Sequence, residues 1–162
     1  MASTLAERIL AMDPPQWQAF ERQQPFPAAA DEAGQAVLRR FAREHLDNAG
    51  PSNRWFTFLD FKVYLRLSRR ALPGERGGAR MIDLADVEVS PAERGKGVFS
   101  RFLRAAEVEA ARLGFGVYVE SILNPVLRDA LERRGYRIDA KDPGFEIWDA
   151  ILSPAEIAQR SA

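Results

Sequence analysis

The chain of 162 residues carries 23 basic and 23 acidic side chains, one histidine and no cysteine. This length fits one domain (1–162) with a sizeable core, and the missing cysteines and single histidine argue against disulfides, thiol nucleophiles and a metal centre. With net charge near zero, no apolar run of about 18 residues and no visible signal peptide, we expect a cytoplasmic protein with no nucleic-acid or membrane partner.

The first third of the chain (1–53) reads as helical. Within residues 3–24, apolar spacing predicts a short helix, an interruption at Pro14-Pro15 and then another helical turn. A longer helix is expected over about 32–47, with Asp31 as a plausible N-cap and residues 48–51 ending it.

A strand pair follows the helical part. Residues 55–59 and 61–70 read as β structure, and apolar residues alternate with more polar ones over 63–68. The Pro- and Gly-rich segment 73–78 predicts a turn into a strand over 79–89. This last strand carries acidic residues at Asp83, Asp86 and Glu88. Buried acids are costly when unpaired, so they hint at function, although pairing with nearby arginines explains them equally well.

The second half alternates helices and strands. Apolar spacing after Gly97 predicts a helix that ends at Gly114, and residues 116–122 read as a strand. Asn124 and Pro125 open a further helix as N-cap and first residue. Strands are expected at 136–139 and 145–150, and a capping box from Ser153 begins a short terminal helix. The order predicts a mixed α/β fold with its core in 54–150 and a tail over 151–162.

The segment between the strand over 79–89 and the helix after Gly97 is the strongest functional signal. Glycines at positions 95 and 97 allow backbone N–H groups to turn toward a ligand, and the following helix offers free N–H groups and a positive dipole end. Arg94 and Lys96 add formal charge. The pattern predicts a site for phosphate or pyrophosphate.

Several ligands fit such a loop, and two can be weighed on sequence. A Walker A loop requires Gly-Lys-Ser/Thr, and here Gly97 follows Lys96, so that motif is absent. A dinucleotide fingerprint is nearly matched by Gly95, Gly97 and Ser100 with Glu120 further on, but it lacks the third glycine. An ordinary strand–loop–helix turn with no ligand is the remaining alternative.

Two segments resemble the GCN5-related N-acetyltransferase (GNAT) family. Arg94-Gly95-Lys96-Gly97 resembles its acetyl-CoA loop, with Phe99 as a departure where the family has Gly or Ala. The helix that runs from Asn124 to the Gly135-Tyr136 pair resembles its second motif. The resemblance covers about residues 62–150 and implies a mostly antiparallel sheet with flanking helices, in the acyl-CoA N-acyltransferase (GNAT-like) fold.

The same resemblance implies an acetyl-CoA-dependent N-acetyltransferase, in which an amine of unidentified nature attacks the thioester directly. It implies Glu88 or Glu120 as the catalytic base, with Asp86 third. It also implies these cofactor-binding residues: Val87, Val89, Arg94, Gly95, Lys96, Gly97, Val98, Phe99, Ser100 and Asn124. A homodimer is possible.

One departure from the family pattern leaves alternatives to an active enzyme open. Leu131 stands where the family often has a tyrosine that protonates the leaving thiolate, and Tyr118 or Tyr136 are the possible substitutes. The alternatives to an active enzyme are therefore a catalytically weak, CoA-binding regulatory module and a dinucleotide-binding domain.

Overall fold

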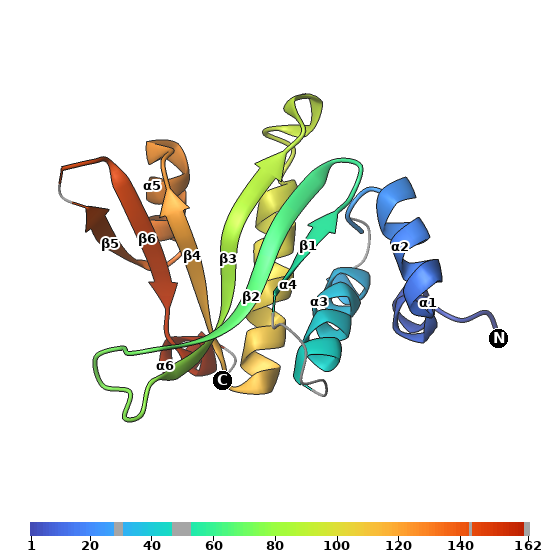
Figure 1. The fold of residues 1–162 in the computed structure, drawn as a ribbon, viewed down its shortest axis with the longest axis horizontal. Helices are drawn as coiled ribbons and strands as arrows, with labels where there is room; N and C mark the ends of the chain where they lie inside the picture. The colour runs from blue at the N-terminus through green and yellow to red at the C-terminus, as the bar shows by residue number, and fades with distance from the viewer. Residues whose placement is uncertain (28–30, 47–52, 143, 161–162) are drawn as a thin grey trace. The chain divides into compact units, whose positions relative to one another are not determined.

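The computed structural model describes residues 1–27, 31–46, 53–142 and 144–160. Within these ranges, helices flank a sheet with the strand order β1-β2-β3-β4-β6-β5 (Figure 1). The helices are α1 (Leu5–Ala11), α2 (Pro14–Gln23), α3 (Asp31–Leu46), α4 (Val98–Leu113), α5 (Pro125–Arg133) and α6 (Pro154–Arg160), with a short 3-10 turn, η1 (Pro91–Glu93). The strands are β1 (Asn53–Thr57), β2 (Phe61–Arg70), β3 (Ala79–Val89), β4 (Gly116–Ile122), β5 (Arg137–Asp142) and β6 (Ile147–Leu152). The predicted mixed α/β class, with a mostly antiparallel sheet, is confirmed.

Contacts divide the chain into two compact units that interleave in sequence. The first unit comprises Met1–Tyr64 and Val87–Glu109, and the second comprises Leu65–Asp86 and Ala110–Ala162. No helix in the described ranges is both long enough and apolar enough to cross a bilayer.

The helical start of the first unit follows its local sequence. Thr4 and Asp13 each cap a helix through a reciprocal capping box, and prolines occupy the first positions of α2. Proline is tolerated there because the N–H that it lacks would have no partner in the helix. The predicted break between two short helices is therefore confirmed, whereas the predicted end of α3 at 48–51 lies outside the described residues.

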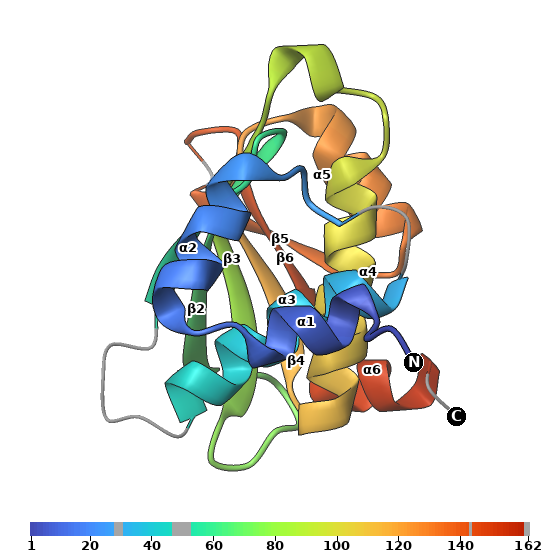
Figure 2. The ribbon, with the colours of Figure 1, turned by 90° about the vertical axis from the view of Figure 1, so that its right-hand side faces the viewer.

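The core of the first unit is aromatic. Six large side chains in it are at most 1% exposed: Trp17, Phe26, Phe41, Phe56, Phe61 and Phe102. Their rings meet mostly edge to face, with centroids 5.3 Å apart for Phe26 and Phe102, a geometry that aromatic pairs prefer. Helices α3 and α4 lie side by side in this unit (Figure 2).

A buried carboxylate holds the turn between β1 and β2 in place. Asp60 Oδ1 accepts a hydrogen bond of 2.8 Å from the backbone N–H of Phe26. The Asp60 carbonyl accepts another, of 3.0 Å, from the backbone N–H of Ser90. These bonds tie the end of β3 to the segment that follows α2, and thereby position the start of the loop that leads to α4.

The second unit is built on mixed pairing. Strands β3 and β4 pair in parallel, from Met81 with Gly116 to Leu84 with Val119. Strand β6 pairs antiparallel with both β4 and β5. Helix α5 buries Leu131, which is 1% exposed.

The last two strands end later than predicted, at Asp142 and Leu152. Asp142 pairs with Ile147 across a register shift, and its Oδ1 accepts a hydrogen bond of 2.9 Å from Gly144 N–H. The Asp142 side chain thus bonds to the backbone of Gly144, and the register shifts beside it, two features that alternation of polar and apolar residues does not reveal.

Gly116 carries a stability prediction. A Cβ at this position would lie 2.5 Å from the Leu152 carbonyl oxygen and 2.7 Å from the Met81 sulfur. We expect Gly116→Ala to lower the free energy of unfolding by about 1–3 kcal/mol, because the sheet backbone must shift. Gly144→Ala is the control for chemical denaturation, since its Cβ would meet nothing nearer than 3.5 Å. Equal stability of the two variants would contradict the packing argument.

Candidate functional site

The loop between β3 and α4 (residues 90–97, hereafter the β3–α4 loop) has the backbone that the glycine spacing predicted. Gly95 and Gly97 adopt φ angles of 77° and 80°. Side-chain-bearing residues rarely adopt these angles, because their Cβ crowds the backbone. Helix α4 begins directly after Gly97 and runs from Val98 to Leu113, long enough for an effective dipole at its start.

The loop and the first turn of α4 leave a row of backbone N–H groups free. Among the described residues, none accepts a hydrogen bond from the backbone N–H of the following five residues: Gly95, Gly97, Val98, Phe99 and Ser100. Between Gly95 and Ser100, the Lys96 N–H alone donates to a described residue, to the Glu93 carbonyl at 3.4 Å. The helical bonds then begin with Arg101 N–H to the Gly97 carbonyl. Free N–H groups at a helix start form a binding site for an anionic oxygen.

Three cationic side chains belong to the loop and the first turn of α4, and each contacts another group of the protein. Arg94 Nε donates to the Val89 carbonyl at 3.3 Å, and Lys96 Nζ lies 3.5 Å from Glu93 Oε2. Arg101, which the motif analysis missed, donates from Nη1 to the Lys96 carbonyl at 2.9 Å. A basic residue one turn into the helix after Gly97 is the sequence signal that could have found it, because i and i+4 positions share a face.

The predicted residues at the end of β3 lie beside the loop in the same unit. Val87 and Val89 are half-buried, whereas Glu88 is exposed. Among the described residues, no side chain or backbone group bonds to the Glu88 carboxylate. A carboxylate without a protein partner is free to accept a proton from a substrate.

Asn124 occupies its predicted place at the start of α5 in the second unit. Its Oδ1 accepts a hydrogen bond of 2.9 Å from the backbone N–H of Val126, so it caps the helix. The capping role is therefore observed. Because Oδ1 is already bonded to Val126, a contact of Asn124 with a cofactor arm would use the side-chain Nδ2 group.

Glu120 lies in the second unit within a network of ion pairs. Arg66 Nη2 contacts Glu120 Oε2 and lies 3.4 Å from Asp83 Oδ2. Lys141 Nζ lies 3.4 Å from Glu120 Oε1. Both carboxylate oxygens of Glu120 thus face cations, and a base role would require one of these contacts to break.

Asp83 is the most deeply buried acid of this network. It is 0% exposed, with Arg70 Nη2 at 2.8 Å from Oδ2 and the Ser68 hydroxyl donating to Oδ1 at 2.7 Å. Pairing with arginines, one of the two explanations open from sequence, accounts for this acid. The remaining acids of β3, Asp86 and Glu88, are exposed.

Asp83 gives a second stability prediction. Asp83→Asn keeps the shape but removes the charge that Arg66 and Arg70 face. Removing one partner of a buried pair costs about 3–5 kcal/mol, and because both arginines are partly exposed we expect a loss nearer 2–3 kcal/mol. Denaturant unfolding of Asp86→Asn is the control, with a change within about 0.5 kcal/mol expected at an exposed site. A stable Asp83→Asn variant would show that the network adds little.

The two tyrosines considered as substitutes for the missing acid are both buried, Tyr118 at 8% and Tyr136 at 3% exposure. Burial raises the pKa of Tyr118 above its usual range, and the hydrogen bond that its hydroxyl donates to Asp149 Oδ2 at 2.5 Å raises it further. A phenol with a raised pKa holds its proton more tightly. Tyr118 is thus poorly suited to protonate a leaving group.

No protein-family model matches the sequence, and no curated protein matches it either. Among solved structures, AtaT complexed with acetyl-methionyl-tRNAfMet has a TM-score of 0.50 at 12% identity, over 85% of this chain and 90% of that chain. The KacTA-DNA complex has a TM-score of 0.48 at 20% identity, over 88% of this chain and 92% of that one. AtaTR bound with AcCoA has a TM-score of 0.46 at 14% identity, over 86% and 90%.

The likeness to AtaT, at this low identity, concerns the fold. AtaT has the GNAT fold, and the chain described here has that fold, as its two motifs predicted. The implied fold is therefore confirmed, while the roles of individual residues stay predictions.

The expectation of no nucleic-acid partner is corrected by the same likeness, because AtaT was solved in complex with a tRNA. Net charge sums the whole chain, whereas nucleic acids bind to local basic surfaces. The charges are unevenly spread along the sequence, since the segment 65–80 has five arginines and one acidic residue. A balanced composition therefore does not exclude this class of partner.

Proposed function

We propose that this protein is an acetyl-CoA-dependent N-acetyltransferase. The observation that carries the proposal is the set of free backbone N–H groups at the start of α4, on a chain with the GNAT fold. These N–H groups belong to Gly95, Gly97, Val98, Phe99 and Ser100. A diphosphate needs several donors and a positive field, and these N–H groups, the α4 dipole and Arg94 supply both.

Acetyl-CoA, when bound, supplies an activated acetyl thioester that an amine can attack. The chain's own part is to hold and orient it. The β3–α4 loop would hold the diphosphate, and Val87 and Val89, at the end of β3, would offer backbone groups to the thioester oxygen. The resemblance to the GNAT family supports the role of the two valines.

The base in this proposal is Glu88 rather than Glu120. An amine acceptor is an ammonium at neutral pH and must lose a proton before it reacts. Glu88 is exposed and free of partners among the described residues, whereas cations face both oxygens of Glu120. With Leu131 in the core, no acid at that position can serve the leaving thiolate. A thiol has a pKa near 8.5, so its thiolate can leave unassisted at modest cost.

The acceptor is an amine, and the kind of molecule that bears this amine is not identified. Because AtaT was solved with acetyl-methionyl-tRNAfMet, an aminoacyl-tRNA belongs in the acceptor panel beside small amines, polyamines and peptide N-termini. The sequence of this chain contains no acceptor motif that would narrow the panel further.

The first test is ligand-induced stabilisation. Acetyl-CoA at 100 times its Kd stabilises a protein by about 2.7 kcal/mol, which corresponds to a rise in Tm of roughly 5–10 °C for a chain of this size. We expect this rise with acetyl-CoA and with CoA, and none with nicotinamide or flavin dinucleotides. No shift at millimolar acetyl-CoA would overturn the proposal, and a shift with a dinucleotide alone would favour the dinucleotide-binding alternative.

The second test is turnover. Mass spectrometry of each acceptor after incubation with acetyl-CoA should detect a mass increase of one acetyl group on an amine. Stabilisation by acetyl-CoA without transfer to any acceptor in the panel would instead support the regulatory CoA-binding module.

A further inference from the structure

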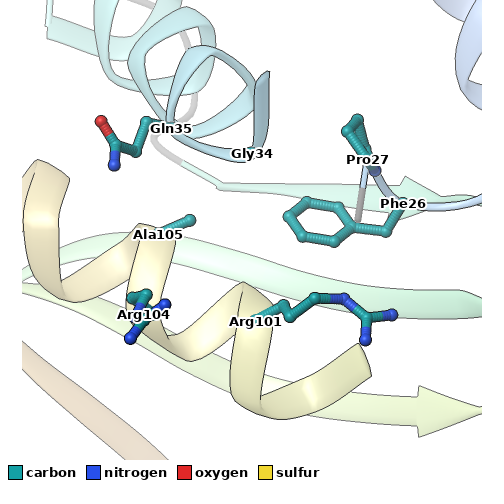
Figure 3. A pocket seen from close by; sticks show the side chains of 7 residues that line it. All are labelled: Phe26, Pro27, Gly34, Gln35, Arg101, Arg104 and Ala105. Atoms are coloured by element: carbon teal, nitrogen blue, oxygen red, sulfur yellow. The ribbon is translucent and has the colours of Figure 1, made fainter. Parts of the chain in front are cut away.

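The hollow between α3 and α4 in the first unit is too small for an acceptor. Its charged lining residues are Arg101 and Arg104 (Figure 3). Its volume of about 10 Å³ has room for one water molecule. Two arginines also repel the ammonium form of an amine. This hollow therefore does not recognise an amine acceptor.

The second unit, by contrast, holds an ammonium group on two oxygen atoms of β4. Lys141 Nζ, on β5, donates to Ser121 Oγ at 2.8 Å and to Glu120 Oε1 at 3.4 Å. An ammonium has three donors, so these two oxygens fix its position and leave one N–H for water. We call Glu120 Oε1 and Ser121 Oγ the ammonium cradle.

An irregular backbone brings the two oxygens of the cradle together. Neighbouring residues of a regular strand point to opposite faces, yet Glu120 and Ser121 reach the same ammonium. The pairing of β4 with β6 shifts register between Val119 and Ile122. Within this bulge Ser121 has a φ angle of 56°, the one positive value at a non-glycine residue in the described ranges. Such strain persists only where the surroundings enforce it, and it is concentrated at functional sites.

Asp149 of β6 enforces the bulge. This residue is 7% exposed, and its Oδ1 accepts a hydrogen bond of 2.9 Å from the backbone N–H of Ser121. Its Oδ2 accepts the hydroxyl proton of Tyr118 at 2.5 Å. Both oxygens of a buried carboxylate thus hold β4, so the cradle is a fixed part of the sheet.

The lysine in the cradle is easily exchanged. Strand β5 is the last in the strand order of the sheet (Figure 1), and the Lys141 side chain is 41% exposed. Exposed ion pairs contribute little to stability, and the flexible lysine stem can swing into solvent. Arg66 stays at Glu120 Oε2, because it also faces the buried Asp83. Another ammonium can therefore replace that of Lys141 while Glu120 keeps its orientation.

We propose that Glu120 and Ser121 select the acceptor by binding one of its ammonium groups in place of Lys141. This inference rests on the proposed function, because it needs an amine acceptor. A carboxylate favours the charged form of an ammonium beside it, and a charged ammonium has no lone pair with which to attack a thioester. The amine in the cradle is therefore not the amine that is acetylated. The acceptor carries a second amino group, as a diamine or a polyamine does.

The test compares acceptors that differ only in this second amino group. The probes are the α,ω-diamines from 1,3-diaminopropane to 1,6-diaminohexane, each with the n-alkylamine of the same length. With the best diamine we expect kcat/KM to exceed that of its matched monoamine by about tenfold, because the monoamine lacks a charged hydrogen bond. Steady-state kinetics should show the difference mainly in KM.

Replacing Lys141 by Met tests the exchange directly. KM for the diamine should fall about threefold, because no lysine then competes for the cradle. A lysine that serves stability alone predicts no such fall. Glu120→Gln should raise KM for the diamine about tenfold and Ser121→Ala about threefold, while KM for the monoamine is unchanged. Asp139→Asn, at an exposed carboxylate on β5, is the control and should change neither KM.

Three results would overturn the inference and leave the proposed function standing. The first is equal kcat/KM for the diamines and their matched monoamines. The second is an unchanged or raised KM for the diamine in Lys141→Met. The third is acetyl transfer to an aminoacyl-tRNA with none to any diamine. Binding of acetyl-CoA without transfer to any amine would overturn the proposed function and the inference together.

Discussion

Replacing Glu88 by Gln is expected to lower kcat for acetyl transfer by about 10²–10⁴-fold, the range typical of a lost general base. Glutamine keeps the size and the exposed position of the side chain but cannot accept the proton of the acceptor ammonium. The Kd of acetyl-CoA should stay within about twofold of wild type, because the loop N–H groups are unaffected. Steady-state kinetics on the best acceptor, together with calorimetry for acetyl-CoA, would separate the two effects.

Two further variants make the Glu88 result interpretable. Glu146→Gln, an exposed carboxylate beside β6, should retain wild-type kcat. Glu120→Gln should be milder than Glu88→Gln, since Arg66 and Lys141 already occupy both oxygens. A larger loss of kcat in Glu120→Gln would move the base to that residue and would mean that its ion pairs open during turnover.

Replacing Gly97 by Ala is expected to weaken acetyl-CoA binding by tenfold or more. The φ angle of Gly97 is 80°, and a residue with a Cβ loses roughly 1–2 kcal/mol in this region. The loop would relax toward ordinary angles and turn its N–H groups away from the diphosphate. Calorimetry measures the affinity, and denaturant unfolding measures the cost in stability.

Gly74 provides a matched control for Gly97. Its φ angle is 83°, and a Cβ there would meet no atom within 4 Å. Gly74→Ala should therefore cost a similar amount of stability while leaving the Kd of acetyl-CoA unchanged. If both variants bind acetyl-CoA equally well, the β3–α4 loop is not the site of the diphosphate.

Local signals in the sequence predicted most of the fold. Helix α4 follows from its apolar spacing and from the glycines at both of its ends, and α5 follows from the Asn124 cap that is observed. Each depends on residues within a few positions of one another. The errors occur at the ends of β5 and β6, where the pairing of the two strands shifts register.

In the candidate site, too, the sequence predicted the local features, and contacts between distant residues decided the rest. Sequence predicted the β3–α4 loop with its two glycines, and it identified Glu88 and Glu120 as equal candidates for the base. The difference between them comes from contacts of Glu120 with Arg66 and Lys141, which are 54 and 21 residues away in the chain. No local pattern could have placed those cations on one carboxylate and left the other free.

The sequence by itself determined the conformation of the loop and the start of α4, because glycine positions, helix spacing and caps act through neighbouring residues. Only the tertiary structure decided which charges are paired. Strand register and helix packing bring distant residues together. Electrostatic interactions depend on those distances rather than on separation along the chain.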